Sequence, residues 1–179
     1  EDPVAMCPVS PQLLHHYDFS NSSACPVKAQ YLVIDGTTAT GALHLREVVV
    51  ANAFGVPYPI LWGELSSTNA DHHIAKCFDN NLTSTPCHSD TTTGWWARFD
   101  LGAPKCIGSV TLYNIATSAS AGIVGASLSL HATSAAAGPT LWSVPIRSAT
   151  LNGGHILEFH VGAYDAVEGA SSAFVGTTR

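Results

Sequence analysis

The sequence predicts an all-β protein, an antiparallel β-sandwich with extended N- and C-terminal arms. Short runs rich in β-branched and aromatic residues recur along the chain and are separated by Gly, Pro, Asn, Ser and Thr. Several runs alternate apolar and polar residues, which is typical of strands with one buried and one solvated face. No window carries the 3.6-residue apolar period of a long amphipathic helix. Together these observations favour two packed sheets.

The elements follow in order along the chain. Residues 1–30 contain Pro3, Pro8, Pro11 and Pro26 without sustained periodicity, so we expect an extended N-terminal arm. Strands are predicted at 31–34, 43–50, 95–101, 107–115, 126–131, 141–146 and 156–161. The sandwich therefore occupies residues 31–161. The Gly/Ala/Ser-rich residues 162–179 are predicted to form a C-terminal tail, either a second arm or a strand.

The alternation also predicts where the tryptophans lie. Leu128 and Leu130 alternate with serines, and Trp142 shares its parity with other apolar residues of its strand. Trp95 has the parity of the apolar residues in its own strand, so both tryptophans are expected in the core. Trp62 lies between a proline and a glycine and is the better candidate for an exposed aromatic that stacks on a sugar.

Composition excludes two classes of partner. The chain has 179 residues and a formal net charge of −6, with only 7 Lys and Arg residues, which are scattered. Binding a polyanion needs clustered cations, so a nucleic-acid partner is not expected. The longest apolar stretch, residues 48–51, is far shorter than the roughly 20 residues of a membrane-spanning helix, so membrane insertion is not expected either.

The cysteines point to disulfides. The chain has five, without a C-x-x-C pair, which argues against a zinc knuckle or a thioredoxin-type motif. Cys77 and Cys87 are close enough in sequence to staple one loop. Cys7 with Cys25 is the next expected pair, which leaves Cys106 over, although spacing alone does not determine the pairing.

Glycosylation sequons strengthen the prediction of a secreted protein. They occur at Asn21-Ser22-Ser23 and at Asn81-Leu82-Thr83. Cysteines, few lysines and abundant Ser, Thr and Ala point in the same direction. We therefore expect an extracellular, disulfide-bonded glycoprotein.

Catalytic signatures are missing from the sequence, so an enzyme is not expected. There is no G-x-S-x-G, H-E-x-x-H, G-x-G-x-x-G or Walker motif. The doublets His15-His16 and His72-His73 either are solvated loop residues or bind a transition metal. Cys87 and His88 are adjacent, and on extended backbone their side chains point to opposite faces, which disfavours a thiol–imidazole pair.

One strand carries a carboxylate where the core is expected. Parity places Glu47 on the same face as Leu45 and Val49. A buried carboxylate needs a cation or hydrogen-bonding partners. The alternatives are a β-bulge, a salt bridge to Arg98 or Lys76, or a metal ion.

Several segments resemble one family of β-sandwich domains. Phe78-Asp79-Asn80-Asn81 is similar to a "D-G-N" loop, Cys87-His88-Ser89 to a "C-H-T" element, and Trp96-Ala97-Arg98-Phe99-Asp100-Leu101-Gly102 to "W-W-x-V-D-L-G". Leu65-Ser66-Ser67-Thr68 and residues 107–114 fit the same pattern. Residues 31–161 thus resemble the galactose-binding-like superfamily, the discoidin and fucose-binding F-type lectin domains. This resemblance implies a jelly-roll sandwich.

The resemblance also implies site residues. His88 falls on the sugar-binding histidine of F-type lectins, whereas the two family arginines are replaced by Ile115 and Gly122. Without those charged donors the fucose mode should be lost. A structural Ca²⁺ is implied, with the ligand set of Glu47 and Asp79 carboxylates, carbonyls of Lys76, Asn81 and Arg46, and a Thr85 oxygen.

Two functions follow from these observations. The first is a secreted, non-catalytic lectin-like module that binds glycans or glycosylated surfaces through loops at 72–73, 85–93 and 115–125, with His88, Trp62, His72 and His73 as candidate ligand-binding residues. The second is a structural protomer of an extracellular filament or matrix that self-associates through its terminal arms.

Overall fold

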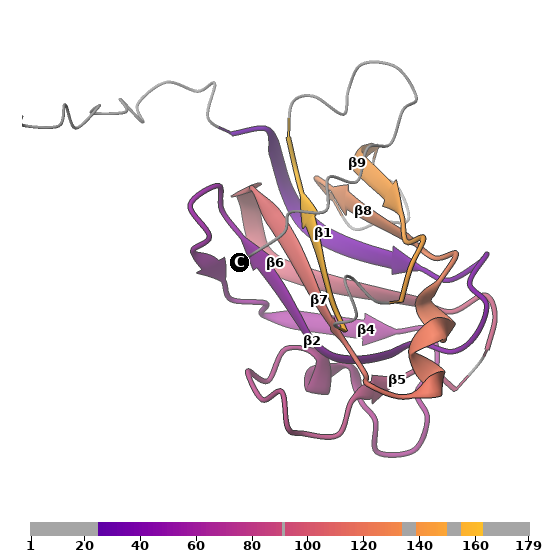
Figure 1. The fold of residues 1–179 in the computed structure, drawn as a ribbon. Helices are drawn as coiled ribbons and strands as arrows, with labels where there is room; N and C mark the ends of the chain where they lie inside the picture. The colour runs from indigo at the N-terminus through magenta and orange to yellow at the C-terminus, as the bar shows by residue number, and fades with distance from the viewer. Residues whose placement is uncertain (1–24, 91, 134–138, 150–154, 163–179) are drawn as a thin grey trace, which may run out of the picture.

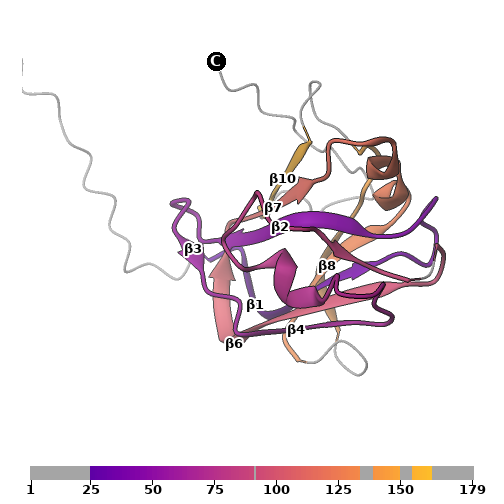
Figure 2. The same cartoon turned by 90° about the horizontal axis from the view of Figure 1, so that it is seen from below.

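The computed structural model describes residues 25–90, 92–133, 139–149 and 155–162 and contains two antiparallel sheets (Figures 1 and 2). The first sheet has the order β4-β6-β1-β8-β9. Its strands are β4 (Trp62–Leu65), β6 (Trp96–Ile107), β1 (Val27–Asp35), β8 (Ser127–His131) and β9 (Thr140–Pro145).

The second sheet has the order β10-β7-β2-β3, and β5 pairs with β2 beside this path. Its strands are β10 (Ile156–His160), β7 (Ser109–Asn114), β2 (His44–Ala51), β3 (Pro57–Tyr58) and β5 (Cys87–His88). Two short 3-10 helices, η2 (Ile74–Cys77) and η3 (Ser118–Ile123), lie in the connections. The arrangement is that of a β-sandwich.

The core lies between the two sheets. Leu32 and Ile34 of β1 are fully buried, as are Phe99 of β6 and Leu112 of β7. The predicted faces agree: Trp95, Trp142, Leu128 and Leu130 are buried. Removing these large apolar side chains from water is the main source of stability for such a fold.

The strand predictions agree with the structure in outline. Each of the seven predicted segments overlaps a strand, but β1 begins at Val27 and not at residue 31, so residues 27–30 belong to the sheet and not to an arm. The short strands β3, β4 and β5 were not predicted, because runs of two to four residues are too short to show alternation. Residues 1–24 and 163–179, with Cys7, His15, His16 and Asn21, lie outside the described residues.

A β-bulge explains the position of Glu47. The pairing of β2 with β7 shifts its register between Leu45 and Glu47. The inward face therefore changes parity, and Leu45, Val48 and Val50 are all buried. Of the alternatives, the bulge is present, whereas Arg98 pairs with Glu64 of β4 and not with Glu47.

The disulfides agree with one predicted pair and correct the other. Cys77 is bonded to Cys87, as the spacing indicated. Cys25 is bonded to Cys106 and not to Cys7, across a sequence separation of 81 residues. The register of β1 on β6 places Lys28 opposite Cys106, which brings Cys25 near. Spacing along the sequence cannot predict a disulfide whose two cysteines are brought together by strand register.

Candidate functional site

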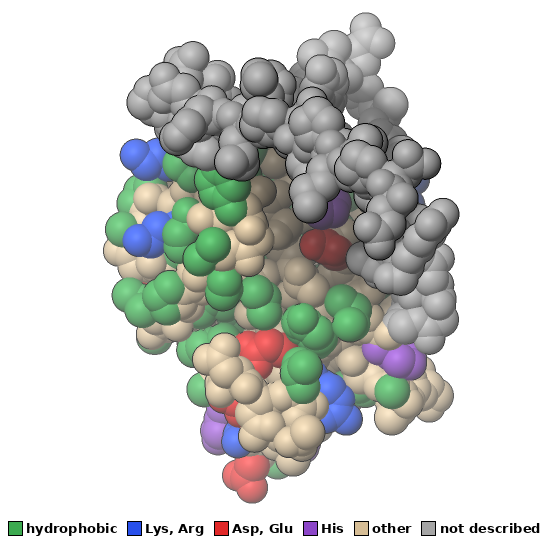
Figure 3. All heavy atoms as spheres, turned by 60° about the vertical axis from the view of Figure 1, so that its left-hand side comes forward, with side chains coloured by type: hydrophobic (Ala, Val, Ile, Leu, Met, Phe, Trp, Pro, Cys, Tyr) green, Lys and Arg blue, Asp and Glu red, His purple; other side chains and the backbone are tan. Residues whose placement is uncertain are grey.

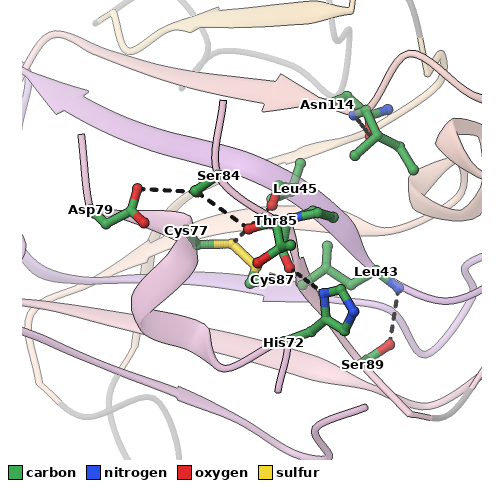
Figure 4. Close-up of a disulfide and its surroundings, with 12 residues drawn as sticks. Leu43, Leu45, His72, Cys77, Asp79, Ser84, Thr85, Cys87, Ser89 and Asn114 are labelled. Atoms are coloured by element: carbon green, nitrogen blue, oxygen red, sulfur yellow. Dashed lines mark hydrogen bonds between the residues drawn. A yellow bond between two sulfur atoms is a disulfide. The ribbon is translucent and has the colours of Figure 1, made fainter. Parts of the chain in front are cut away.

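One candidate site lies where η2 and β5 pack below β2, and we call it the loop end (Figures 1 and 4). The buried Cys77–Cys87 disulfide joins η2 to β5. The backbone N–H of Leu43 donates to the buried Ser89 hydroxyl at 3.0 Å, and the N–H of Ser89 donates to the Leu43 carbonyl at 3.2 Å. These contacts fix the short strand β5 against β2 although it has only two residues.

Three imidazoles meet at the loop end. The register of β2 on β5 sets His44 opposite His88, and their ring centroids are 3.6 Å apart. The ring of His72 meets that of His88 edge-on at 5.7 Å. His72 Nδ1 lies 2.8 Å from the Pro86 carbonyl oxygen and His44 Nδ1 3.3 Å from that of Ala42, so each ring is held by the backbone. The structure brings His72 and His88 together, and His44 is a member that the sequence did not indicate.

The surroundings keep two of these rings neutral. Burial lowers the pKa of His44, although its contact with the Ala42 carbonyl works against this shift. Burial also lowers the pKa of His88, and the neighbouring His44 and His72 lower it further, while Asp90 opposes the shift. Uncharged imidazole both donates and accepts hydrogen bonds, which suits a polar uncharged ligand.

Two carboxylates also meet at this end of the molecule. Glu47 is buried, with 4% of its surface exposed, and its Oε2 has no hydrogen-bond partner. Burial raises the pKa of Glu47, and the Asp79 carboxylate raises it further; backbone N–H groups of Asn81, Asn80 and Val48 oppose the shift. The paired acids thus come from segments 32 residues apart in sequence.

The turn that carries Asp79 is ordered by local hydrogen bonds. Asp79 Oδ1 accepts from the backbone N–H of Asn81 at 2.9 Å, and Asn80 adopts a φ of 58°, a left-handed conformation that Asn tolerates better than most residues. Nη1 of Arg46 donates to the carbonyls of Leu82 at 3.0 Å and of Ser84 at 3.2 Å. Asn81, the second sequon, is exposed.

The calcium ligand set expected from the sequence also includes residues beyond the two carboxylates. Lys76 lies in η2, and Thr85 is exposed on the loop that follows Ser84. Within the described ranges, no group of three or more His, Cys, Asp or Glu side chains is placed to hold a metal ion. Calcium also takes carbonyl and hydroxyl oxygens, so a site with only two carboxylates remains compatible with its chemistry.

Other candidate residues do not join the loop end. Trp62 is 47% exposed, as predicted, but it lies on β4 and contacts Arg98. His73 is exposed directly before η2. Ile115 is buried, and a side chain at Gly122 would meet the carbonyl oxygen of Ala42. Neither Ile115 nor Gly122 therefore offers a side chain to a ligand.

The outer face of the first sheet holds residues that sequence analysis did not connect. The Arg98 guanidinium lies 5.5 Å from the centroid of the Trp62 ring and 5.6 Å from that of the Trp96 ring. Its Nη2 donates a hydrogen bond to Glu64 Oε2 at 2.5 Å. β4 brings Trp62 and Glu64 to Arg98 through its pairing with β6. Had residues 62–65 been predicted as a strand, pairing with β6 would have linked Trp62 and Glu64 to Arg98.

The remaining surface is poor in charge. Figure 3, which looks at the side of the molecule that carries β3, shows hydrophobic side chains scattered among uncharged polar ones. Phe54, Val56 and Leu61 are the most exposed large apolar residues described. None of the helices in the described part of the chain has the length and apolar character needed to cross a membrane.

Comparison with known proteins adds nothing to these observations: no family model, curated protein or solved structure matches this chain.

Proposed function

We propose that this chain is a secreted, non-catalytic module that binds glycans or glycosylated surfaces, with a jelly-roll sandwich of the galactose-binding-like type. The observation that carries the proposal is the loop end, where the rings of His72 and His88 meet and the Cys77–Cys87 disulfide ties η2 to β5. Rigid polar groups on a loop bind at a lower ordering cost than mobile ones. The two disulfides suit an oxidising, extracellular compartment.

Calcium is part of this proposal as a structural ion. Glu47 and Asp79 would supply the carboxylates, and the orphaned Oε2 of Glu47 is the atom that most needs a cation. A bound divalent ion would neutralise the paired acids and hold the 79–85 turn against β2. The expected role is to support the neighbouring histidine loop, not to take part in a reaction.

The test is a glycan array probed with the full chain in calcium chloride and in EGTA. We expect binding that weakens at least tenfold in His72→Ala and His88→Ala. His160→Ala is the matched control, because His160 is exposed on β10 opposite Ser109, at the other end of the second sheet. An array without any ligand in either condition would contradict the proposal.

A filament or matrix protomer remains the alternative from the sequence. Its predicted arms are residues 1–30 and 162–179, of which 1–24 and 163–179 lie outside the described residues, so no described contact favours it.

A further inference from the structure

A groove of roughly 500 Å³ runs over the outer face of the first sheet, and we call it the sheet groove. That volume falls within the ~300–1,000 Å³ usual for small-ligand sites. β1 and β6 contribute Val33, Asp35, Trp96 and Arg98. β8 and β9 contribute Ser127, Ser129, His131, Thr140 and Ser143, and Thr37 lies just beyond β1.

Half of the described residues that line the groove carry a hydroxyl group, and two of them, Ser127 and Ser129, face the groove because of the alternation along β8. Leu128 and Leu130 enter the core, so Ser127 and Ser129 face outward. Only Val33 and Trp96 are apolar among the lining residues. Hydroxyls both donate and accept hydrogen bonds, which matches the hydroxyls of a saccharide better than the apolar side chains of a peptide.

The polar groups are already oriented. Asp35 Oδ1 accepts from the backbone N–H of Thr37 at 2.8 Å and from its hydroxyl at 2.6 Å. Ser129 Oγ and His131 Nε2 are hydrogen-bonded at 2.9 Å. Trp96 is kept in place by the Arg98 guanidinium, which Glu64 holds in turn. A ligand would therefore bind without first ordering its site.

Charge decides which saccharides fit. Among the described residues that line the groove, Asp35 and Arg98 are the only Asp, Glu, Lys or Arg residues, and the Arg98 guanidinium is already paired with the Glu64 carboxylate. The chain as a whole carries a formal charge of −6. Sulfated or sialylated chains would meet repulsion here, so the lining favours an uncharged ligand.

We propose that the sheet groove binds a neutral oligosaccharide laid across β6, β1, β8 and β9. Neighbouring strands lie ~4.8 Å apart, so the four strands span ~14 Å, which is longer than one sugar ring. The inference rests on the proposed function in taking a glycan as ligand, but it assigns a surface separate from the loop end.

The experiment is an NMR titration of the ¹⁵N-labelled full chain with cellohexaose, xylohexaose and maltohexaose, and with a heparin hexasaccharide as the anionic probe. We expect one neutral probe to shift the indole N–H signal of Trp96. Trp96→Ala and Ser143→Tyr should each weaken that binding at least tenfold. Thr92→Tyr is the matched control, because it adds the same ring to an exposed position outside the groove lining and should bind normally.

The variants separate this inference from the proposed function. Ser143 is exposed, so Ser143→Tyr should fold even if Trp96→Ala does not. Neutral binding that survives Ser143→Tyr but is lost in His72→Ala would overturn the sheet groove and leave the proposed function standing. Binding of the heparin hexasaccharide alone would overturn the assignment of a neutral ligand. If no probe binds and the glycan array is also blank, both proposals fail.

Discussion

The loop end and the sheet groove reach a fixed geometry by different means. At the loop end a two-residue strand is held by the Cys77–Cys87 disulfide and by contacts of Ser89 with Leu43. Titratable groups are buried there, and the pKa of Glu47 and that of His88 are shifted by burial. The sheet groove instead sits on a continuous ladder of paired strands and presents hydroxyls. A backbone ladder holds the groove side chains in place by strand pairing alone, whereas the two-residue strand at the loop end is also tied by a disulfide.

The largest expected effect on stability comes from removing a disulfide, and its size should differ between the two bridges. Removing Cys25–Cys106 by double substitution to Ala releases a constraint across 81 residues and should cost about 4–5 kcal/mol of unfolding free energy. Removing Cys77–Cys87, which spans only 10 residues, should cost about 3 kcal/mol. Urea denaturation of both variants measures the difference. A larger loss from the shorter bridge would show that strain or local packing dominates over chain entropy.

Gly122→Ala should lower the free energy of unfolding by about 1–3 kcal/mol, because the new Cβ would collide with the carbonyl oxygen of Ala42. Thermal unfolding followed by circular dichroism measures the loss. Gly94→Ala is the comparison for steric crowding, since nothing lies within 4 Å of a Cβ there, although its positive φ adds some backbone strain of its own. Equal losses in the two variants would show that crowding at Gly122 is unimportant.

Glu47→Gln tests the paired acids. The pKa of Glu47 is raised on folding, so its ionised form at neutral pH destabilises the folded state. This destabilisation is absent below pH 4.5, the pKa of the group in the unfolded chain, because the carboxyl is then protonated in both states. In EGTA at pH 7 the free energy of unfolding of the variant should therefore exceed that of the wild type by on the order of 1 kcal/mol. Calcium should raise the melting temperature of the wild type but not of the variant.

Glu158→Gln, on the exposed part of β10, is the matched control and should respond to calcium as the wild type does. A wild-type melting temperature that calcium leaves unchanged would remove the structural ion from the proposal.

The smallest effect concerns pH. The pKa values of His44 and His88 are lowered on folding, so the unfolded chain binds protons more readily. The contribution of these two neutral rings to the stability of the folded state is complete above pH 6.5 and is lost as the pH falls below that value. His44→Phe keeps a ring in the stack without a titrating group, so its melting temperature should fall less between pH 7 and pH 5. Identical pH profiles would rule out His44 as the cause.

Sequence reasoning recovered the parts of the fold that depend on local pattern. Alternation placed Trp95, Leu128 and Trp142 in the core, and the spacing of Cys77 and Cys87 indicated their bond. It failed where a contact depends on the pairing of strands that are far apart in sequence. The Cys25–Cys106 bond follows from the register of β1 on β6.

The candidate sites divide in the same way. His72 and His88 were named from the sequence, and the structure places their rings in contact. His44 joins them only because β2 pairs with β5. Trp62 was named as an exposed aromatic, but its partners Arg98 and Trp96 emerge from the pairing of β4 with β6.

The sequence by itself determined an all-β chain with a stapled loop and which side of most strands faces the core, because alternation and short spacing act over a few residues. Only the tertiary structure decided that a β-bulge lies at Glu47 and that residues of four strands line one groove. Strand order and register set those positions, and they depend on the packing of the whole molecule.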